Sequence, residues 1–232
     1  MQDFRVIEMD MSDIEWKTSH NLMEYAAAQS YMEQRVEQII NNKAAQHIWF
    51  LEHPPLYTAG TSAKPQDLVD AKRFPVYETG RGGQFTYHGP GQRVAYIMLD
   101  LKQKSSFCDG DGALPDIRQF VTFLENWMIA CLKKMGLHAR TYKERVGVWV
   151  DDQHGKESKI GAIGIRVRRH VSFHGFALNV SPDLGHFSGI IPCGIHDYGV
   201  TSLKALGVDV TLEEIDALLK QSFWEQYNIT RA

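Results

Sequence analysis

Residues 81–92 read Arg81-Gly82-Gly83-Gln84-Phe85-Thr86-Tyr87-His88-Gly89-Pro90-Gly91-Gln92, and an apolar segment lies on either side of them. This much glycine, together with a proline, is typical of a loop rather than of a strand. Glycine lets another molecule approach the main chain closely, and Arg81 and His88 add polar side chains. We therefore expect this loop to form one wall of a substrate slot, with Lys159 and Cys193 at the slot's reactive end.

The whole composition indicates a soluble globular protein, because 44% of the 232 residues are hydrophobic and 23% are charged. A net charge of -3 argues against a general nucleic-acid binder, which usually carries a basic excess. No apolar run approaches the roughly 20 residues that span a bilayer, and the first residues lack a signal-peptide pattern. We expect a cytoplasmic protein with no nucleic-acid or membrane partner.

Outward from the glycine-rich loop, the sequence predicts strands that cluster and helices that flank them. Helices are expected at 16–40, 115–135 and 211–227, and strands at 4–9, 46–52, 76–79, 93–101, 146–150, 159–167 and 171–180. Residues 53–65, 102–112 and 181–198 are expected to be irregular. Without a regular strand-helix alternation, this pattern favours an α+β layer fold. We expect a single catalytic domain over 1–232, with residues 201–232 as a possible small C-terminal subdomain.

The three cysteines are far apart and odd in number, so neither a disulfide framework nor a structural zinc site is indicated. No histidine cluster has metal-ligand spacing, and we expect no metal. Cys131 lies on the apolar stripe of a helix, and Cys108 lies beside carboxylates that suppress a thiolate. Cys193 lies between Pro192 and Gly194, where its sulfur and the Gly194 N–H are open to a substrate. A structural cysteine in a turn is the alternative.

Lys159 is the candidate helper of Cys193, because a thiol with a pKa near 8.5 needs activation at neutral pH. It begins an apolar, small-residue strand, and an ammonium in a poorly solvated site stabilises a thiolate and has its own pKa lowered. Such a lysine can move protons. The alternative is a solvated lysine beside the polar loop 151–158.

Small residues recur on two neighbouring predicted strands: Gly161, Ala162, Gly164, Gly175 and Ala177. Small side chains leave a groove, and large apolar neighbours would form its walls: Ile163, Phe173, Phe176 and Tyr87. Ordinary close packing against a helix is the alternative. A thin apolar groove that ends at a thiol would suit a straight acyl chain.

Taken together, these segments resemble the lipoyl(octanoyl) transferase family, the octanoyl-carrier-protein:protein transferases of lipoate assembly. Besides residues 81–92, the resemblance is carried by Lys159-Ile160-Gly161-Ala162-Ile163-Gly164 and Ser172-Phe173-His174-Gly175-Phe176-Ala177-Leu178-Asn179. Pro192-Cys193-Gly194 and Gly199-Val200-Thr201-Ser202-Leu203 complete it, in the family's order and approximate spacing.

The resemblance implies a mixed sheet flanked by helices, as in lipoate and biotin protein ligases. It also implies that Cys193 carries an octanoyl group as a thioester and that Lys159 lowers the cysteine pKa and handles protons. The implied substrate-binding residues are Arg81, Gly82, Gly83, Gln84, Phe85, Thr86, Tyr87, His88, Ala162, Ile163, Gly164, Gly175, Phe176 and Ala177. No cofactor is implied. His88 could orient a carbonyl group or a proton, but we assign it no catalytic role from the sequence.

The implied donor is octanoyl-acyl carrier protein, and the implied acceptors are lipoyl domains of 2-oxoacid dehydrogenase complexes and the glycine cleavage H protein. Arg166, Arg168 and Arg169 could meet an acidic carrier protein, although a solvated hairpin tip also explains them. Two other readings stay open. One is an ATP-dependent lipoate or biotin protein ligase, since Gly80-Arg81-Gly82-Gly83 superficially resembles a nucleotide-binding loop. The other is a non-catalytic binding module.

Overall fold

The computed structural model describes residues 14–102, 107, 115–191 and 198–229. The strand expected at 4–9, together with Cys108 and Cys193, lies outside the described residues, as does most of the loop expected at 102–112.

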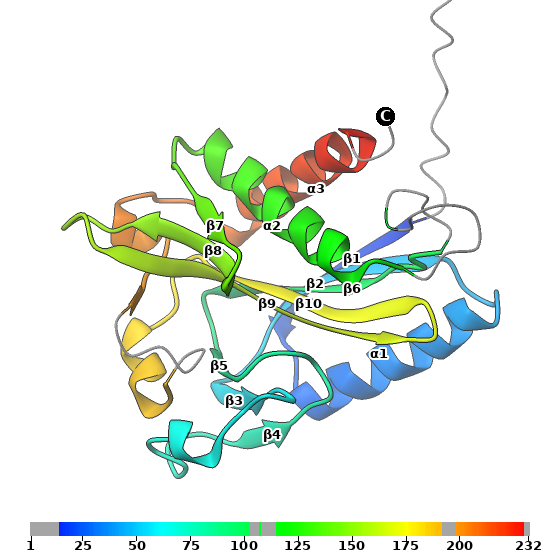
Figure 1. The fold of residues 1–232 in the computed structure, drawn as a ribbon, viewed down its shortest axis with the longest axis horizontal. Helices are drawn as coiled ribbons and strands as arrows, with labels where there is room; N and C mark the ends of the chain where they lie inside the picture. Colours follow the sequence, from blue (N-terminus) through cyan, green and yellow to red (C-terminus); the bar gives the residue numbers. More distant parts are fainter. Residues whose placement is uncertain (1–13, 103–106, 108–114, 192–197, 230–232) are drawn as a thin grey trace, which may run out of the picture.

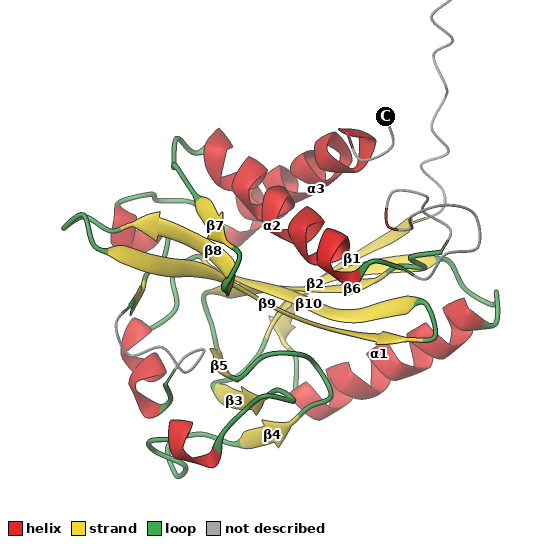
Figure 2. Cartoon of the chain, viewed as in Figure 1, coloured by secondary structure: helices red, strands yellow, loops and turns green. Residues whose placement is uncertain are grey.

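A large mixed sheet forms the centre of the described structure, with its strands in the order β1-β2-β6-β10-β9-β8-β7 and with β11 beside β9 (Figure 1). The pairs β1/β2 and β11/β9 are parallel, and the other pairs are antiparallel. The strands are β1 (Ile14–Leu22), β2 (Gln46–Glu52), β6 (Gln92–Met98), β7 (Arg140–Tyr142), β8 (Arg145–Asp151), β9 (Glu157–Arg168), β10 (Val171–Asn179) and β11 (Gly199–Val200). Helices flank this sheet, which confirms the predicted fold class (Figure 2).

A second, smaller sheet has the order β4-β3-β5, from β4 (Val76–Glu78), β3 (Leu56–Ala59) and β5 (Phe85–His88). Two predictions were wrong here, because both 53–65 and the glycine-rich stretch were expected to be irregular. Each region contains a run of four residues with the aromatic and β-branched side chains that strands favour, and these runs pair antiparallel with each other. The glycines and prolines lie outside the pairing, where they end the strands.

The helices are α1 (Tyr25–Ile40), α2 (Ile117–Lys134) and α3 (Leu212–Ile229), with short 3₁₀ turns η2 (Pro65–Asp67), η4 (Leu184–Gly189) and η6 (Lys204–Leu206). The helix expected at 16–40 was wrong over its first part, because residues up to Leu22 pair with β2 in the sheet. Strong helix formers begin only near Tyr25. The spacing of Thr211 and Glu214, three residues apart, predicts a capping box at the start of α3. The structure confirms it, since the Glu214 N–H donates to Thr211 Oγ1 at 3.2 Å and the Thr211 N–H donates to Glu214 Oε2 at 2.8 Å.

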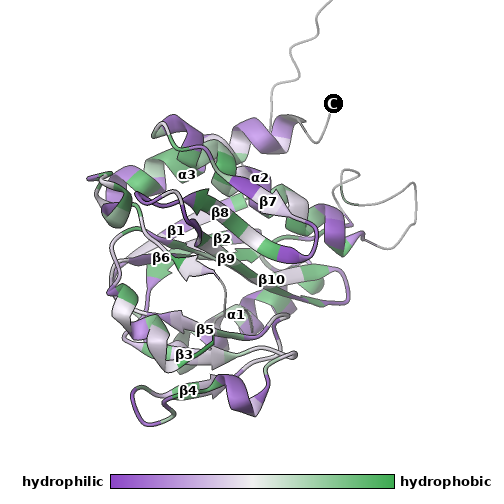
Figure 3. Cartoon of the chain, turned by 60° about the vertical axis from the view of Figure 1, so that its left-hand side comes forward, coloured by the Kyte–Doolittle hydropathy of each residue, from purple (hydrophilic) through white to green (hydrophobic). Residues whose placement is uncertain are grey.

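The helices cover opposite faces of the large sheet, with α2 and α3 on one face and α1 and the small sheet on the other (Figure 1). Beneath α2 and α3 lies the main core, where Trp127 packs edge-on against Phe223 and Phe176. Hydrophobic residues gather along the central strands and polar residues along outer loops and turns (Figure 3). Among the described residues, no helix is long and apolar enough to cross a bilayer.

Candidate active site

A cavity of about 270 Å³ lies between the large sheet and the segment that links β4 to β5. Strands β6, β9 and β10 supply its floor, and residues 81–88 supply the opposite wall. Most of the residues predicted for the site line this cavity: Arg81, Gly83, Gln84, Phe85, Thr86, His88, Lys159, Ala162, Ile163, Gly164, Gly175, Phe176 and Ala177. Segments far apart in the sequence therefore line the same cavity.

Two of the residues predicted for the site are not among those that line the cavity. Gly82 donates its N–H to the Ile165 carbonyl at 2.8 Å, which fastens the loop to β9. Tyr87 lies in a separate aromatic cluster, and its hydroxyl bonds to His186 Nδ1 at 2.8 Å. Because side chains alternate along β5, the side chain of Tyr87 faces away from those of Thr86 and His88, which line the cavity. Phe85 borders the cavity and also packs in the same cluster as Tyr87. Cys193 lies outside the described residues.

Arg81 is buried, and its guanidinium organises the loop as well as the cavity wall. It donates to the Thr58 carbonyl at 2.9 Å, to Thr58 Oγ1 at 2.7 Å and to the Gln84 carbonyl at 3.0 Å. A Cβ at Gly164 would stand 2.9 Å from the Arg81 Cδ. The planar, multiply donating guanidinium therefore holds β3, the loop and β9 in one arrangement.

The small residues of β9 and β10 do not all leave an open groove, so that part of the prediction was wrong. A Cβ at Gly161 would stand 2.8 Å from the Met128 sulfur, and a Cβ at Gly175 would stand 2.2 Å from the Ala95 carbonyl oxygen. These glycines permit close packing against α2 and β6. The space at Gly164 is filled by the stem of Arg81.

Lys159 lines the cavity and is only 7% exposed, which favours the buried-lysine interpretation over the solvated one. Its Nζ donates to the Val146 carbonyl at 2.9 Å and lies 4.8 Å from the centre of the Trp149 ring. Gly147 has φ +126°, and a Cβ there would stand 3.2 Å from this Nζ. The ammonium thus lies in a slot whose walls are β8 backbone and an aromatic face.

A buried carboxyl group lies behind this slot, on the apolar stripe of α2. The Oε1 atom of Glu125 accepts the Gly147 N–H at 3.0 Å. Burial raises the pKa of Glu125, while the Gly147 N–H and the Lys159 ammonium act in the opposite direction. Glu125 therefore holds the backbone of Gly147, which contacts Lys159. Its position among the apolar residues of a helix did not predict this role.

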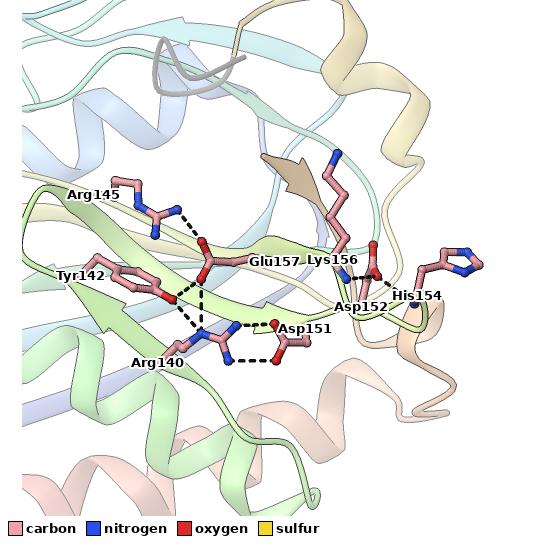
Figure 4. A network of polar contacts seen from close by, with 8 residues as sticks. All are labelled: Arg140, Tyr142, Arg145, Asp151, Asp152, His154, Lys156 and Glu157. Atoms are coloured by element: carbon pink, nitrogen blue, oxygen red, sulfur yellow. Dashed lines mark hydrogen bonds and ion pairs between the residues drawn. The ribbon is translucent and has the colours of Figure 1, made fainter. Parts of the chain in front are cut away.

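A second cation, Arg145, lines the cavity and belongs to a polar network that spans β7, β8 and β9 (Figure 4). Glu157 accepts from Arg145 at 2.5 Å and also contacts Tyr142 and Arg140, and Arg140 pairs with Asp151. The Arg145 guanidinium lies 3.9 Å from the centre of the Tyr142 ring. The network holds Arg145 in place, and both Arg145 and Lys159 lie against the Trp149 ring.

Two buried histidines that were not predicted for the site lie at the cavity or next to it. His174 lines it with φ +58°, and burial, followed by the charges of Arg81 and Arg166, lowers its pKa to about 3. A positive φ in a residue with a side chain stores backbone strain of the kind found at functional sites. His53 packs against His88 and Tyr96, and burial lowers its pKa to about 4.

The described part of the chain contains no group of three or more side chains placed to hold a metal ion. Cys131 is buried in the main core as predicted, and burial raises the pKa of its thiol to about 12. A thiol this basic is protonated and unreactive at neutral pH.

Comparison with known proteins assigns the family. The family model "Lipoyl protein ligase A/B catalytic domain" matches residues 24–224. An octanoyltransferase of Zymomonas mobilis is 52% identical over 213 residues, which cover 92% of this chain and 94% of that protein. One from Paramagnetospirillum magneticum is 52% identical over 214 residues, which cover 92% of this chain and 97% of that protein.

Solved structures confirm the ligase-like fold. Protein Ta0514 of T. acidophilum, solved with bound lipoic acid, matches with a TM-score of 0.65 at 16% identity, over 93% of this chain and 85% of that one. Identity this low shows the fold alone, whereas the octanoyltransferases share half of the sequence over nearly its full length. The chain belongs to the octanoyltransferase family, whose catalytic domain is that of the lipoyl protein ligases A and B.

Proposed function

We propose that the protein moves an octanoyl group from acyl carrier protein to a lysine of a lipoyl domain, through a thioester on Cys193. The observation that carries this proposal is the convergence of residues 81–88, 162–164 and 175–177 on one cavity with a buried lysine at its edge. Membership of the octanoyltransferase family supports the same chemistry. We further propose that residues 1–232 form one catalytic domain.

The first half-reaction exchanges one thioester for another. The Cys193 thiolate attacks the donor carbonyl carbon, a new C–S bond forms, and the carrier's thiolate leaves with the electrons of the old C–S bond. Because both sides are thioesters, the step is nearly balanced and needs no ATP. In the second half-reaction the acceptor amine attacks, an amide C–N bond forms, and the Cys193 thiolate leaves.

Lys159 would serve both half-reactions. Its ammonium stabilises the negative charge that the sulfur carries before the first attack and after the second. The carrier's thiolate takes a proton from Lys159 as it leaves, and the neutral Lys159 amine then accepts the proton that the attacking nitrogen loses in the second half-reaction. The tight slot formed by Val146, Gly147 and Trp149 supports this role, because it leaves the ammonium few other positions.

The proposed acceptors are the lipoyl domains of 2-oxoacid dehydrogenase complexes and the glycine cleavage H protein. For the donor, Arg166 is exposed on β9, and the adjacent Arg168 and Arg169 add charge at the β9–β10 hairpin. A positive hairpin fits an acidic carrier protein by charge complementarity.

The test is a two-substrate assay with the purified enzyme, octanoyl-carrier protein and a lipoyl domain. We expect an octanoyl-lysine amide to form without ATP. The competing reading, motivated by the ligase-like fold, requires ATP and free octanoate. Product formation only from free octanoate plus ATP would contradict the proposal, and no product under either condition would favour a binding module.

A further inference from the structure

A chain of hydrogen bonds through two buried amide side chains runs from Thr201, directly after β11, to His88 in the cavity. The Asn179 Nδ2 atom donates to the Thr201 carbonyl at 3.0 Å. A backbone carbonyl can only accept a hydrogen bond, so this contact fixes which end of the Asn179 amide carries the nitrogen. The Asn179 Oδ1 atom is therefore turned to Gln92, whose Nε2 donates to it at 2.9 Å.

Two hydrogen bonds fix which end of the Gln92 side-chain amide is the nitrogen. Its Nε2 also donates to the Tyr87 carbonyl at 3.1 Å, a second partner that can only accept. The Gln92 Oε1 atom must then be the end that faces His88, and it lies 2.7 Å from the His88 Nδ1 atom. An amide oxygen accepts, so the Nδ1 atom of His88 carries the proton.

The other ring nitrogen, Nε2, is left with a lone pair. Burial first, and the nearby His53 ring second, lower the pKa of His88 to about 3, so the ring is neutral near pH 7. His53 uses both of its own nitrogens elsewhere: one bonds to the Met23 carbonyl at 2.5 Å and the other to the Tyr96 hydroxyl at 2.7 Å. Within the described part of the chain no hydrogen bond to the His88 Nε2 atom is found, and His88 lines the cavity.

The same chain of contacts also reaches the lysine. The Thr201 N–H donates to the Lys159 carbonyl at 3.0 Å, and β11 pairs with β9 at this position. The backbone of Lys159 and the ring of His88 are therefore held in register by Thr201, Asn179 and Gln92. All three of these residues are buried.

We propose that the Nε2 atom of His88 accepts a hydrogen bond from the amine of the lipoyl-domain lysine. Gln92 and Asn179 hold His88 in the Nδ1–H tautomer that this hydrogen bond requires. The inference rests on the proposed function and adds a group that acts in one half-reaction only. An amine that donates one N–H to the Nε2 atom has its lone pair free to point at the thioester carbon. The C–N bond then forms, the C–S bond to Cys193 breaks with its electrons on sulfur, and Lys159 accepts the proton. His88 itself takes no proton.

In the first half-reaction the His88 Nε2 atom has no hydrogen bond to accept from the nucleophile, because the attacking group is a thiolate without a proton to donate. A purely structural His88 would behave differently. A structural His88 would contribute only through the hydrogen bond from its Nδ1 atom to Gln92. Loss of that bond would slow both half-reactions or unfold the protein. The two roles use different nitrogens, and two substitutions separate them.

The experiment compares His88→Asn with His88→Gln in single turnovers. Asparagine places its amide near the Nδ1 position and keeps the bond to Gln92, whereas glutamine places its amide near the Nε2 position. Acylation by octanoyl-carrier protein is followed by intact mass, and transfer from the isolated acyl-enzyme to a lipoyl domain is followed separately. We expect the transfer rate of His88→Asn to fall roughly 10- to 100-fold more than its acylation rate, and the ratio of the two rates to be restored toward wild type in His88→Gln.

Equal slowing of both half-reactions, or transfer at the wild-type rate in His88→Asn, would overturn the inference. A wild-type enzyme that never becomes acylated would contradict the proposed function itself, which is a distinguishable result. The tautomer is tested without any variant, by long-range ¹H–¹⁵N NMR of the histidine-labelled protein. The expected spectrum shows His88 protonated at Nδ1 near pH 7, and protonation at Nε2 would overturn the inference whatever the kinetics.

Discussion

Gly147 and Lys159 touch across β8 and β9, so closely that a Cβ at residue 147 would stand 3.1 Å from the lysine Cε and 3.2 Å from its Nζ. The same Cβ would stand 2.6 Å from the Gly161 carbonyl oxygen, and the backbone at 147 has φ +126°. The glycine is thus required both by its conformation and by the space that the lysine occupies.

Gly147→Ala should therefore displace the lysine and lower turnover roughly 100-fold, as a shift of about 1 Å does in other active sites. Steady-state assays with octanoyl-carrier protein measure this. Gly155→Ala is the matched control, because Gly155 also has a positive φ (+71°) but has nothing within 4 Å of its Cβ position. If the two variants lost the same activity, backbone strain rather than the contact with Lys159 would explain both.

Lys159→Met keeps most of the side-chain stem and removes the ammonium. We expect acylation and transfer each to slow roughly 100-fold or more, with the folded state retained, because proton transfer and thiolate stabilisation are both lost. Lys134→Met is the control, since Lys134 pairs with Glu225 at the surface, outside the cavity. A Lys159→Met enzyme with normal rates would remove the lysine from the mechanism.

A buried ion pair joins Arg93 of β6 to Asp216 of α3 and so ties the C-terminal helix to the sheet. Its atoms are 2.8 Å apart, and burial raises the pKa of Asp216 to about 6 even though Arg93 acts in the opposite direction. Asp216→Ala should lower the free energy of unfolding by about 3–5 kcal/mol, because it leaves a buried guanidinium unpaired.

Urea unfolding measures the cost of Asp216→Ala, with Glu225→Ala as the control on the same helix. Glu225 forms its ion pair with Lys134 at the surface, so its loss should cost at most about 1 kcal/mol. A cost for Asp216→Ala as small as that would mean that the Arg93 pair contributes little to docking α3.

Buried histidines make the stability depend on pH. Burial lowers the pKa of His88 to about 3, below the value of about 6.5 for an unfolded chain. The unfolded state then binds the extra proton, so the contribution of His88 is complete above pH 6.5 and is lost as the pH falls from there toward 3. The slope approaches about 1.4 kcal/mol per pH unit.

His88→Gln should therefore flatten the pH dependence of the free energy of unfolding between pH 6.5 and 4.5. Comparing the slopes of the two proteins isolates His88 from other groups, including Asp216, whose raised pKa acts in the opposite sense. The same slope in both proteins would show that His88 is protonated as readily in the folded state as in the unfolded one.

How much the sequence predicted depends on whether a residue's role is local. The compact apolar run at β2 and the capping box of α3 were predicted with their bounds or contacts, because both rest on neighbouring residues. For most of β1 the sequence predicts the start of a helix, since only the pairing with β2 makes this segment a strand. Glu125 and His174 were missed as parts of the site, because burial and strain at these positions come from segments far away in the sequence.

The proposed thioester on Cys193 is tested most directly by intact-mass analysis of the enzyme mixed with octanoyl-carrier protein and no acceptor. We expect a gain of one octanoyl group on the wild-type chain and on Cys108→Ala and Cys131→Ala, and no gain on Cys193→Ala. A mass gain that persists in Cys193→Ala, or a wild-type chain that turns over without ever carrying the group, would contradict it.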